Sequence, residues 1–244
     1  MELLSGVHLV GSGRLGFSMS DDHDCNVYLV SSGTDAVLVD AGCGLEAELI
    51  LSRIERADAR SVSRILLTHA HADHAAGARR LASALGADVY ASAPVAEILE
   101  SGDEARAGLT AARRAGTYPG TLELPPTEIS RRIGDGTLAV GRLEIEVIET
   151  PGHAAGHLSF AVASGGSTAL FTGDTLFARG RVAVLATPDT DLAALAASID
   201  RLAAVRPDVL LPGHCEPVLR GATAHIEIAR RAMAAGSLPP SLLD

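Results

Sequence analysis

The 244-residue chain contains no lysine, and all 20 of its basic residues are arginines. Without lysine it cannot form a Schiff base with a substrate, bind pyridoxal phosphate covalently or use the lysine of a P-loop. Acidic residues outnumber basic ones by 30 to 20, which gives a formal net charge of -10. A surface of that sign disfavours the phosphate backbone of a nucleic acid, so we expect no nucleic-acid partner.

Long apolar runs and paired cysteines are also missing. No stretch of about 18 apolar residues occurs, so we expect no membrane span. The segment that opens the sequence lacks the early positive charge of a secretory signal. The three cysteines, Cys25, Cys43 and Cys215, show no C-x-x-C spacing. These features together predict a protein of the reducing cytoplasm without a membrane partner.

Hydrophobic residues make up 47% of the chain, enough to fill the core of one large domain. Apolar runs rich in valine, isoleucine and leucine alternate with turns and with segments of helical periodicity. The strands are predicted at 25–30, 36–42, 63–69, 87–92, 136–153 (as a hairpin), 157–164, 167–174 and 208–214. The helices are predicted at 45–57, 75–86, 191–205 and 221–236.

Runs of strands flanked by helices predict sheets covered by helices, rather than a doubly wound sheet. Residues 93–135 break this rhythm with several glycines and prolines. We interpret them as an insertion over one edge, with a short helix at 103–115. The whole chain, 1–244, is then a single α/β domain.

Histidines and aspartates interrupt the apolar strands at their ends. The densest cluster is Thr-His-Ala-His-Ala-Asp-His at 68–74, and Pro-Gly-His, Thr-Gly-Asp and a second Pro-Gly-His follow later. A lone histidine at a strand end is ordinarily structural, but aspartate and histidine are rarely buried unless paired or bound to metal. Because strand ends meet at one edge of a sheet, we expect a shared metal site. The candidate ligands are His69, His71, Asp73, His74, His153, Asp174 and His214.

These ligand types suit two divalent cations about 3.5–4 Å apart. His69 and His71 lie two residues apart in extended chain and project to the same side. The natural division gives His69, His71 and His153 to one cation and Asp73, His74 and His214 to the other. Asp174 then bridges them. Zinc is the expected metal, and iron and manganese accept the same ligands.

The ordered motifs T-H-x-H-x-D-H, P-G-H, G-D-T and P-G-H resemble those of the metallo-β-lactamase superfamily. The resemblance implies an αββα sandwich of two mixed β-sheets with helices on the outer faces and the metal site at their shared edge. It implies the same seven ligands. Asp40 matches the first motif of that family, and its implied role is to orient a ligand histidine and raise its basicity.

Within the superfamily, G-H-A-A-G-H at 152–157 and G-D-T-L-F at 173–177 look most like the glyoxalase II and thioesterase-like branch. We therefore expect a hydrolase in which a bridging hydroxide attacks a small thioester, lactone or ester, and Asp73 orients that hydroxide. Glyoxalase II also has a long helical region with a basic glutathione-binding residue after the last motif. Only 30 residues follow His214 here, which disfavours glutathione as the substrate.

Two alternatives stay open. A mononuclear Fe(II) enzyme resembling persulfide dioxygenases would use His153, Asp174 and one of His69 and His71. A metal-stabilised binding module would need no open coordination position. The pocket candidates outside the ligand set are His157 and Tyr118, and the oligomeric state is not predicted.

Overall fold

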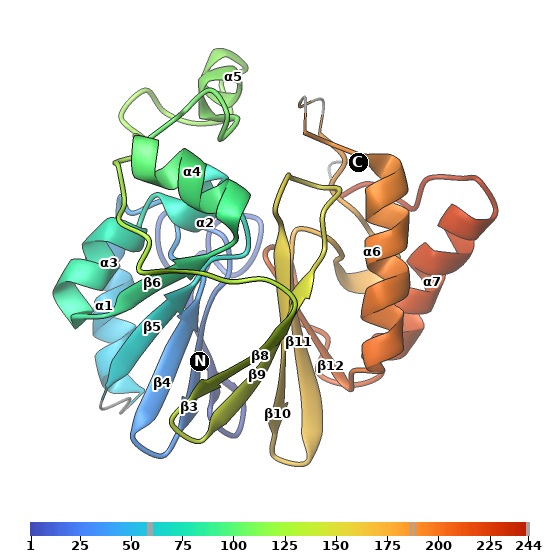
Figure 1. Ribbon diagram of the computed structural model, residues 1–244, viewed down its shortest axis with the longest axis horizontal. Helices are drawn as coiled ribbons and strands as arrows, with labels where there is room; N and C mark the ends of the chain where they lie inside the picture. Colours follow the sequence, from blue (N-terminus) through green and yellow to red (C-terminus); the bar gives the residue numbers. More distant parts are fainter. Residues whose placement is uncertain (58–60, 186, 188, 243–244) are drawn as a thin grey trace.

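The computed structural model describes residues 1–57, 61–185, 187 and 189–242. Two β-sheets pack face to face (Figure 1). The first has the order β1-β2-β3-β4-β5-β6-β7 and the second the order β12-β11-β10-β9-β8. The strands of the first sheet are β1 Glu2–Leu4, β2 Val7–Gly11, β3 Val27–Ser32, β4 Asp35–Val39, β5 Val62–Leu66, β6 Asp88–Ala91 and β7 Arg131–Arg132. Those of the second sheet are β8 Gly136–Val140, β9 Leu143–Glu149, β10 Leu158–Ser164, β11 Ser167–Gly173 and β12 Val209–Pro212.

Both sheets are mixed. In the first, the pairs from β1 to β4 are antiparallel and those from β4 to β7 are parallel. In the second, only β11 and β12 pair in parallel. Parallel neighbouring strands have their carboxyl ends at the same edge of a sheet. The polar motifs that follow these strands therefore meet at that edge.

Helices cover the outer faces of the sandwich (Figure 1). The first sheet packs its apolar outer face on α1 Ala47–Arg56, α3 Ala78–Leu85 and α4 Ala93–Ser101. The second packs on α6 Leu192–Val205 and α7 Ala222–Ala234. A third apolar cluster fills the space between the sheets and includes Tyr28, Phe160 and Phe171. This arrangement confirms the expected αββα sandwich.

Several local expectations need correction. The helix expected at 75–86 is two helices, α2 Ala72–Ala75 and α3, separated by the turn at Gly77. Residues 93–135 hold two helices rather than one, α4 and α5 Leu109–Arg114, as well as β7. The sequence does carry a start signal for α4, because the Ser92 hydroxyl accepts a hydrogen bond from the Val95 amide and Pro94 occupies the first turn. Strands β1 and β2 were not expected. In the described part of the chain, no helix is long and apolar enough to cross a membrane.

Contacts between the sheets fix the ends of their strands. Tyr28 on β3 meets Phe171 on β11 with 5.4 Å between ring centroids. The Tyr28 hydroxyl also donates to the carbonyl of Pro212, at the end of β12, over 2.7 Å. Asn26 donates to the same carbonyl over 3.0 Å. The loop that follows β12 is therefore held against the first sheet.

A close backbone approach joins the loop after β4 to the turn before α3. The Gly77 amide donates to Gly42 O over 2.9 Å, and a Cβ at position 77 would collide with the carbonyl oxygen of Ala41. Only glycine fits this position without a shift of backbone.

We predict that Gly77→Ala lowers the free energy of unfolding by about 1–3 kcal/mol, because the added methyl group overpacks this contact. Urea denaturation measures the change. Gly120→Ala is the matched control, since a Cβ there meets nothing within 4 Å. Equal stability of the two variants would contradict the assignment of this contact.

Candidate metal centre

Three histidine nitrogens converge at the edge shared by the two sheets. His69 and His71 follow β5, and His153 follows β9. His71 Nδ1 lies 2.9 Å from His69 Nε2 and 3.1 Å from His153 Nε2. The three ligand atoms thus form a tight cluster that suits one cation.

Hydrogen bonds on the far side of these rings select the tautomer. The Thr68 hydroxyl donates to the Asp40 carboxylate over 2.9 Å, so its oxygen accepts from His69 Nδ1–H over 2.9 Å. His153 Nδ1–H donates to the carbonyl of Ala183 over 2.8 Å. Because each outer nitrogen carries the proton, Nε2 of His69 and of His153 points inward with a free lone pair.

A second group lies beside the first. His74 Nε2 is 3.3 Å from His214 Nε2, and Asp73 Oδ2 is 3.1 Å from His214 Nε2. His74 Nδ1–H donates to Asp40 Oδ2 over 2.8 Å, which directs Nε2 toward the cluster. Asp73, His74 and His214 therefore offer a carboxylate oxygen and imidazole nitrogens to a common point.

Asp174, which follows β11, lies between the two groups. Its Oδ1 is 3.3 Å from His74 Nε2, and its Oδ2 is 3.7 Å from His153 Nε2 and 3.5 Å from His214 Nε2. Among the described side chains, Asp174 Oδ1 is a buried polar atom without a hydrogen-bond donor. A buried carboxylate oxygen left in this state is costly unless a cation compensates it.

Space around Asp174 is kept open by the second Pro-Gly-His motif. A Cβ at Gly213 would collide with Asp174 Oδ1 and would lie 2.6 Å from His74 Cε1. The Gly213 amide instead donates to the carbonyl of Gly173 over 2.7 Å. The seven predicted ligands are thus brought together around a space edged by imidazole nitrogens and by Asp174 Oδ1, which accepts no hydrogen bond from the described side chains. The donor set fits two divalent cations.

Asp40 ties the two groups to each other. It is 1% exposed, follows β4 and adopts a left-handed backbone with φ of 62°, a conformation that aspartate and asparagine tolerate better than most residues. Its carboxylate accepts from His74 Nδ1 and from the amide and hydroxyl of Thr68, which in turn accepts from His69. One carboxylate therefore orients one histidine in each group.

Charge and burial move the histidine pKa values in opposite directions in the two groups. Burial and the neighbouring imidazole of His153 lower the pKa of His71 to about 4. Burial also acts to lower the pKa of His214, but the carboxylates of Asp174 and Asp73 outweigh it and raise that pKa to about 9. A cation that binds beside His214 at neutral pH must therefore displace a proton.

The two pocket candidates lie in different places. His157 is fully buried and does not line the cavity, contrary to expectation. Its Nε2 accepts a hydrogen bond from the Asp174 amide over 3.1 Å, so it holds the backbone of a ligand. Tyr118 lines the cavity as expected. Burial and the Asp73 carboxylate raise the pKa of its hydroxyl well above the ordinary value.

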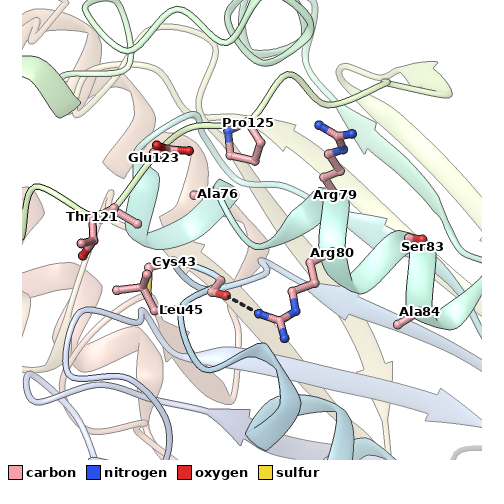
Figure 2. A pocket seen from close by; sticks show the side chains of 12 residues that line it. Cys43, Leu45, Ala76, Arg79, Arg80, Ser83, Ala84, Thr121, Glu123 and Pro125 are labelled. Atoms are coloured by element: carbon pink, nitrogen blue, oxygen red, sulfur yellow. Dashed lines mark hydrogen bonds between the residues drawn. The ribbon is translucent and has the colours of Figure 1, made fainter.

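The cavity above the cluster has a volume of about 340 Å³ and reaches five of the predicted ligands. Those ligands are His71, Asp73, His153, Asp174 and His214. A second hollow, of about 630 Å³, lies between α3 and the segment 121–125 and contains none of them (Figure 2).

Sequence reasoning named Asp40 as an orienting residue but missed Thr68 and the carbonyl of Ala183, which orient His69 and His153. Thr68 immediately precedes the first ligand, and its position at the end of an apolar strand was the available signal. The sequence does not mark Ala183 as an orienting residue, because every residue has a backbone carbonyl group. The loop that presents it is placed by tertiary packing alone.

Comparisons with known proteins agree with this geometry. A model of the metallo-beta-lactamase superfamily matches residues 20–214. An uncharacterized protein of Mycobacterium tuberculosis is 31% identical over 207 residues, which are 81% of this chain and 89% of that protein. A hydroxyacylglutathione hydrolase of Cereibacter sphaeroides is 36% identical over 119 residues, which are 49% of this chain and 36% of the relative. The match with that hydrolase is therefore partial.

Solved structures share the fold. A metallo-beta-lactamase of Cronobacter sakazakii superposes with a TM-score of 0.69 at 24% identity, over 88% of this chain and 80% of that one. The Rm3 metallo-beta-lactamase gives 0.71 at 24% identity, over 96% and 92% of the two chains.

We predict that Asp40→Asn weakens zinc affinity about 10–100-fold, because it removes the carboxylate that orients His69, through Thr68, and His74. Asparagine keeps the shape and tolerates the positive φ. Competition with a chromophoric chelator measures the affinity. The exposed Asp200 provides the control variant Asp200→Asn. Unchanged affinity in Asp40→Asn would show that Asp40 does not support the cations.

Proposed function

The chain belongs to the metallo-β-lactamase superfamily, and we propose that it is a metal-dependent hydrolase of a small thioester, lactone or ester. One observation carries the proposal. Two complete donor groups face each other across Asp174, and the Oδ1 atom of Asp174 is buried without a hydrogen-bond donor. The cavity above them admits a small molecule to the cluster.

His69, His71 and His153 would hold one cation, Asp73, His74 and His214 the other, and Asp174 both. When bound, such a pair of cations acidifies water and polarises a carbonyl group. Cys25 lies beside His74, but its thiol is fully buried, does not line the cavity, and has a pKa that burial raises to about 12, so it is not an available nucleophile. An activated water is therefore the proposed nucleophile.

Asp73 is one of the two carboxylates that belong to the ligand cluster and also line the cavity. Burial acts to raise its pKa, but His74 and His214 outweigh that effect and lower the pKa well below the ordinary value. The carboxylate is therefore ionised at neutral pH. It accepts a hydrogen bond from the attacking water and orients its lone pair toward the substrate carbonyl.

Convergence of the second group supports hydrolysis over the oxygenase alternative. A single iron held by two histidines and a carboxylate would leave Asp73, His74 and His214 without a role. These three buried side chains lie within ligand distance of one another. The named activity of the Cereibacter sphaeroides relative, a hydroxyacylglutathione hydrolase, favours a thioester within the substrate class.

The test is a panel of neutral thioesters, lactones and esters assayed with the zinc-reconstituted protein. We expect hydrolysis of at least one class, and Asp73→Asn should lower kcat/KM at least about 100-fold through loss of the oriented water. Asp200→Asn should retain wild-type activity. Oxygen uptake with glutathione persulfide by a protein holding one iron per chain, without hydrolysis, would overturn the proposal.

A further inference from the structure

One wall of the cavity above the cluster is made of the smallest side chains. Ala107, Gly108, Ala111, Ala112 and Ala115 line it from α5 and the turn before that helix. Gly108, with φ of 73°, is the N-cap of α5, and a Cβ there would lie 3.8 Å from His71 Nε2. The helix therefore passes close to the ligands, and its small residues leave room for a substrate beneath it.

Larger aliphatic side chains complete the lining. Leu15, Leu185 and Leu242 come from three distant parts of the chain and line the same cavity. Leu242 is held there by the hydrogen bond from its amide to the carbonyl of Val182, over 2.8 Å. Apart from the metal ligands, the described polar side chains of the lining are Thr117, Tyr118 and Thr187.

Among the described residues of this lining, none is an arginine. Arg113 on α5 does not face the cavity, because its guanidinium pairs with Glu104 at 2.6 Å and donates to the carbonyl of Leu122. Arg79 and Arg80 line the other hollow, which shares no residue with this cavity (Figure 2). A carboxylate beside the alanines and leucines of this lining would find no arginine, and His214, the lining residue whose pKa is raised, belongs to the ligand cluster.

We propose that this cavity binds an uncharged aliphatic acyl group and discriminates against substrates that carry a carboxylate there. This inference rests on the proposed function and deepens it, since it names the substrate class. The volume of about 340 Å³, at about 30 Å³ for each water-sized unit, holds roughly ten non-hydrogen atoms.

The test measures binding rather than turnover. Neutral primary amides with acyl chains of two to ten carbons, and the same amides ending in a carboxylate, are titrated into the zinc-loaded protein by calorimetry. Each methylene that enters the cavity should lower Kd about threefold to fourfold until the cavity is full. A terminal carboxylate should raise Kd at least about tenfold.

Variants locate the effect on α5. Ala111→Leu and Ala115→Leu fill the cavity from exposed positions, so the fold is spared. Both should reduce the longest acyl chain that still gains affinity. Thr117→Arg adds a cationic side chain to the lining and should reduce the ratio of Kd values between the carboxylate-terminated and the neutral amides. Ala105→Leu is the matched control, because Ala105 is exposed and outside the lining.

The inference would be overturned if the amides did not bind or if their Kd did not change with chain length. It would also be overturned if the amides with a terminal carboxylate bound as tightly as the neutral amides. The proposed function fails separately. If the amides bind as expected while no ester, lactone or thioester is hydrolysed, the cavity assignment stands and the hydrolase does not. Hydrolysis that prefers anionic acyl groups would support the hydrolase and refute the cavity assignment.

Discussion

The site depends on hydrogen bonds made by the outer nitrogens of its histidines. A neutral imidazole has one donor nitrogen and one acceptor nitrogen, so fixing the outer one as a donor leaves the inner one as a lone pair. Thr68, Ala183 and Asp40 supply those outer acceptors. Without them, the buried rings could adopt either tautomer, and their inner nitrogens would compete for protons rather than present a common set of ligands.

The sandwich places these partners. β4 and β5 lie side by side in the first sheet, and β11 and β12 in the second, each pair in parallel. Their carboxyl ends therefore bring Asp40, His69, Asp174 and His214 to one edge. The apolar layer between the sheets stabilises this arrangement, and Tyr28 and Asn26 join the loop after β12 to the first sheet. The affinity of the site for cations is thus coupled to the packing of the core.

Much of this could be predicted from sequence. The ligand set followed from polar residues that interrupt strongly apolar strands, because burial of such residues requires compensation. The αββα sandwich followed from the resemblance of the ordered motifs to those of the metallo-β-lactamase superfamily. The orienting carbonyl of Ala183 could not be predicted, since a backbone acceptor leaves no mark on the sequence. His157 was expected in the pocket lining, whereas it is buried outside that lining and accepts a hydrogen bond from the Asp174 amide, a contact that the sequence does not reveal.

The break at Gly77 shows the same limit in the fold. Helical periodicity runs through 75–86, but the Gly77 amide donates to the carbonyl of Gly42, a tertiary contact that interrupts the helical hydrogen bonds there. The helix α4 was missed for a different reason. Ser92 is a recognisable helix cap, but the many glycines and prolines between residues 93 and 135 favoured an irregular segment over a helix at this position.

The most direct test of the account is the number of cations that each chain retains. Equilibrium dialysis against zinc, followed by elemental analysis, should give two per chain for the wild type and one for His214→Ala, with the fold retained. A wild-type protein that is folded and retains fewer than two, or a variant that retains as many as the wild type, would contradict the central claim.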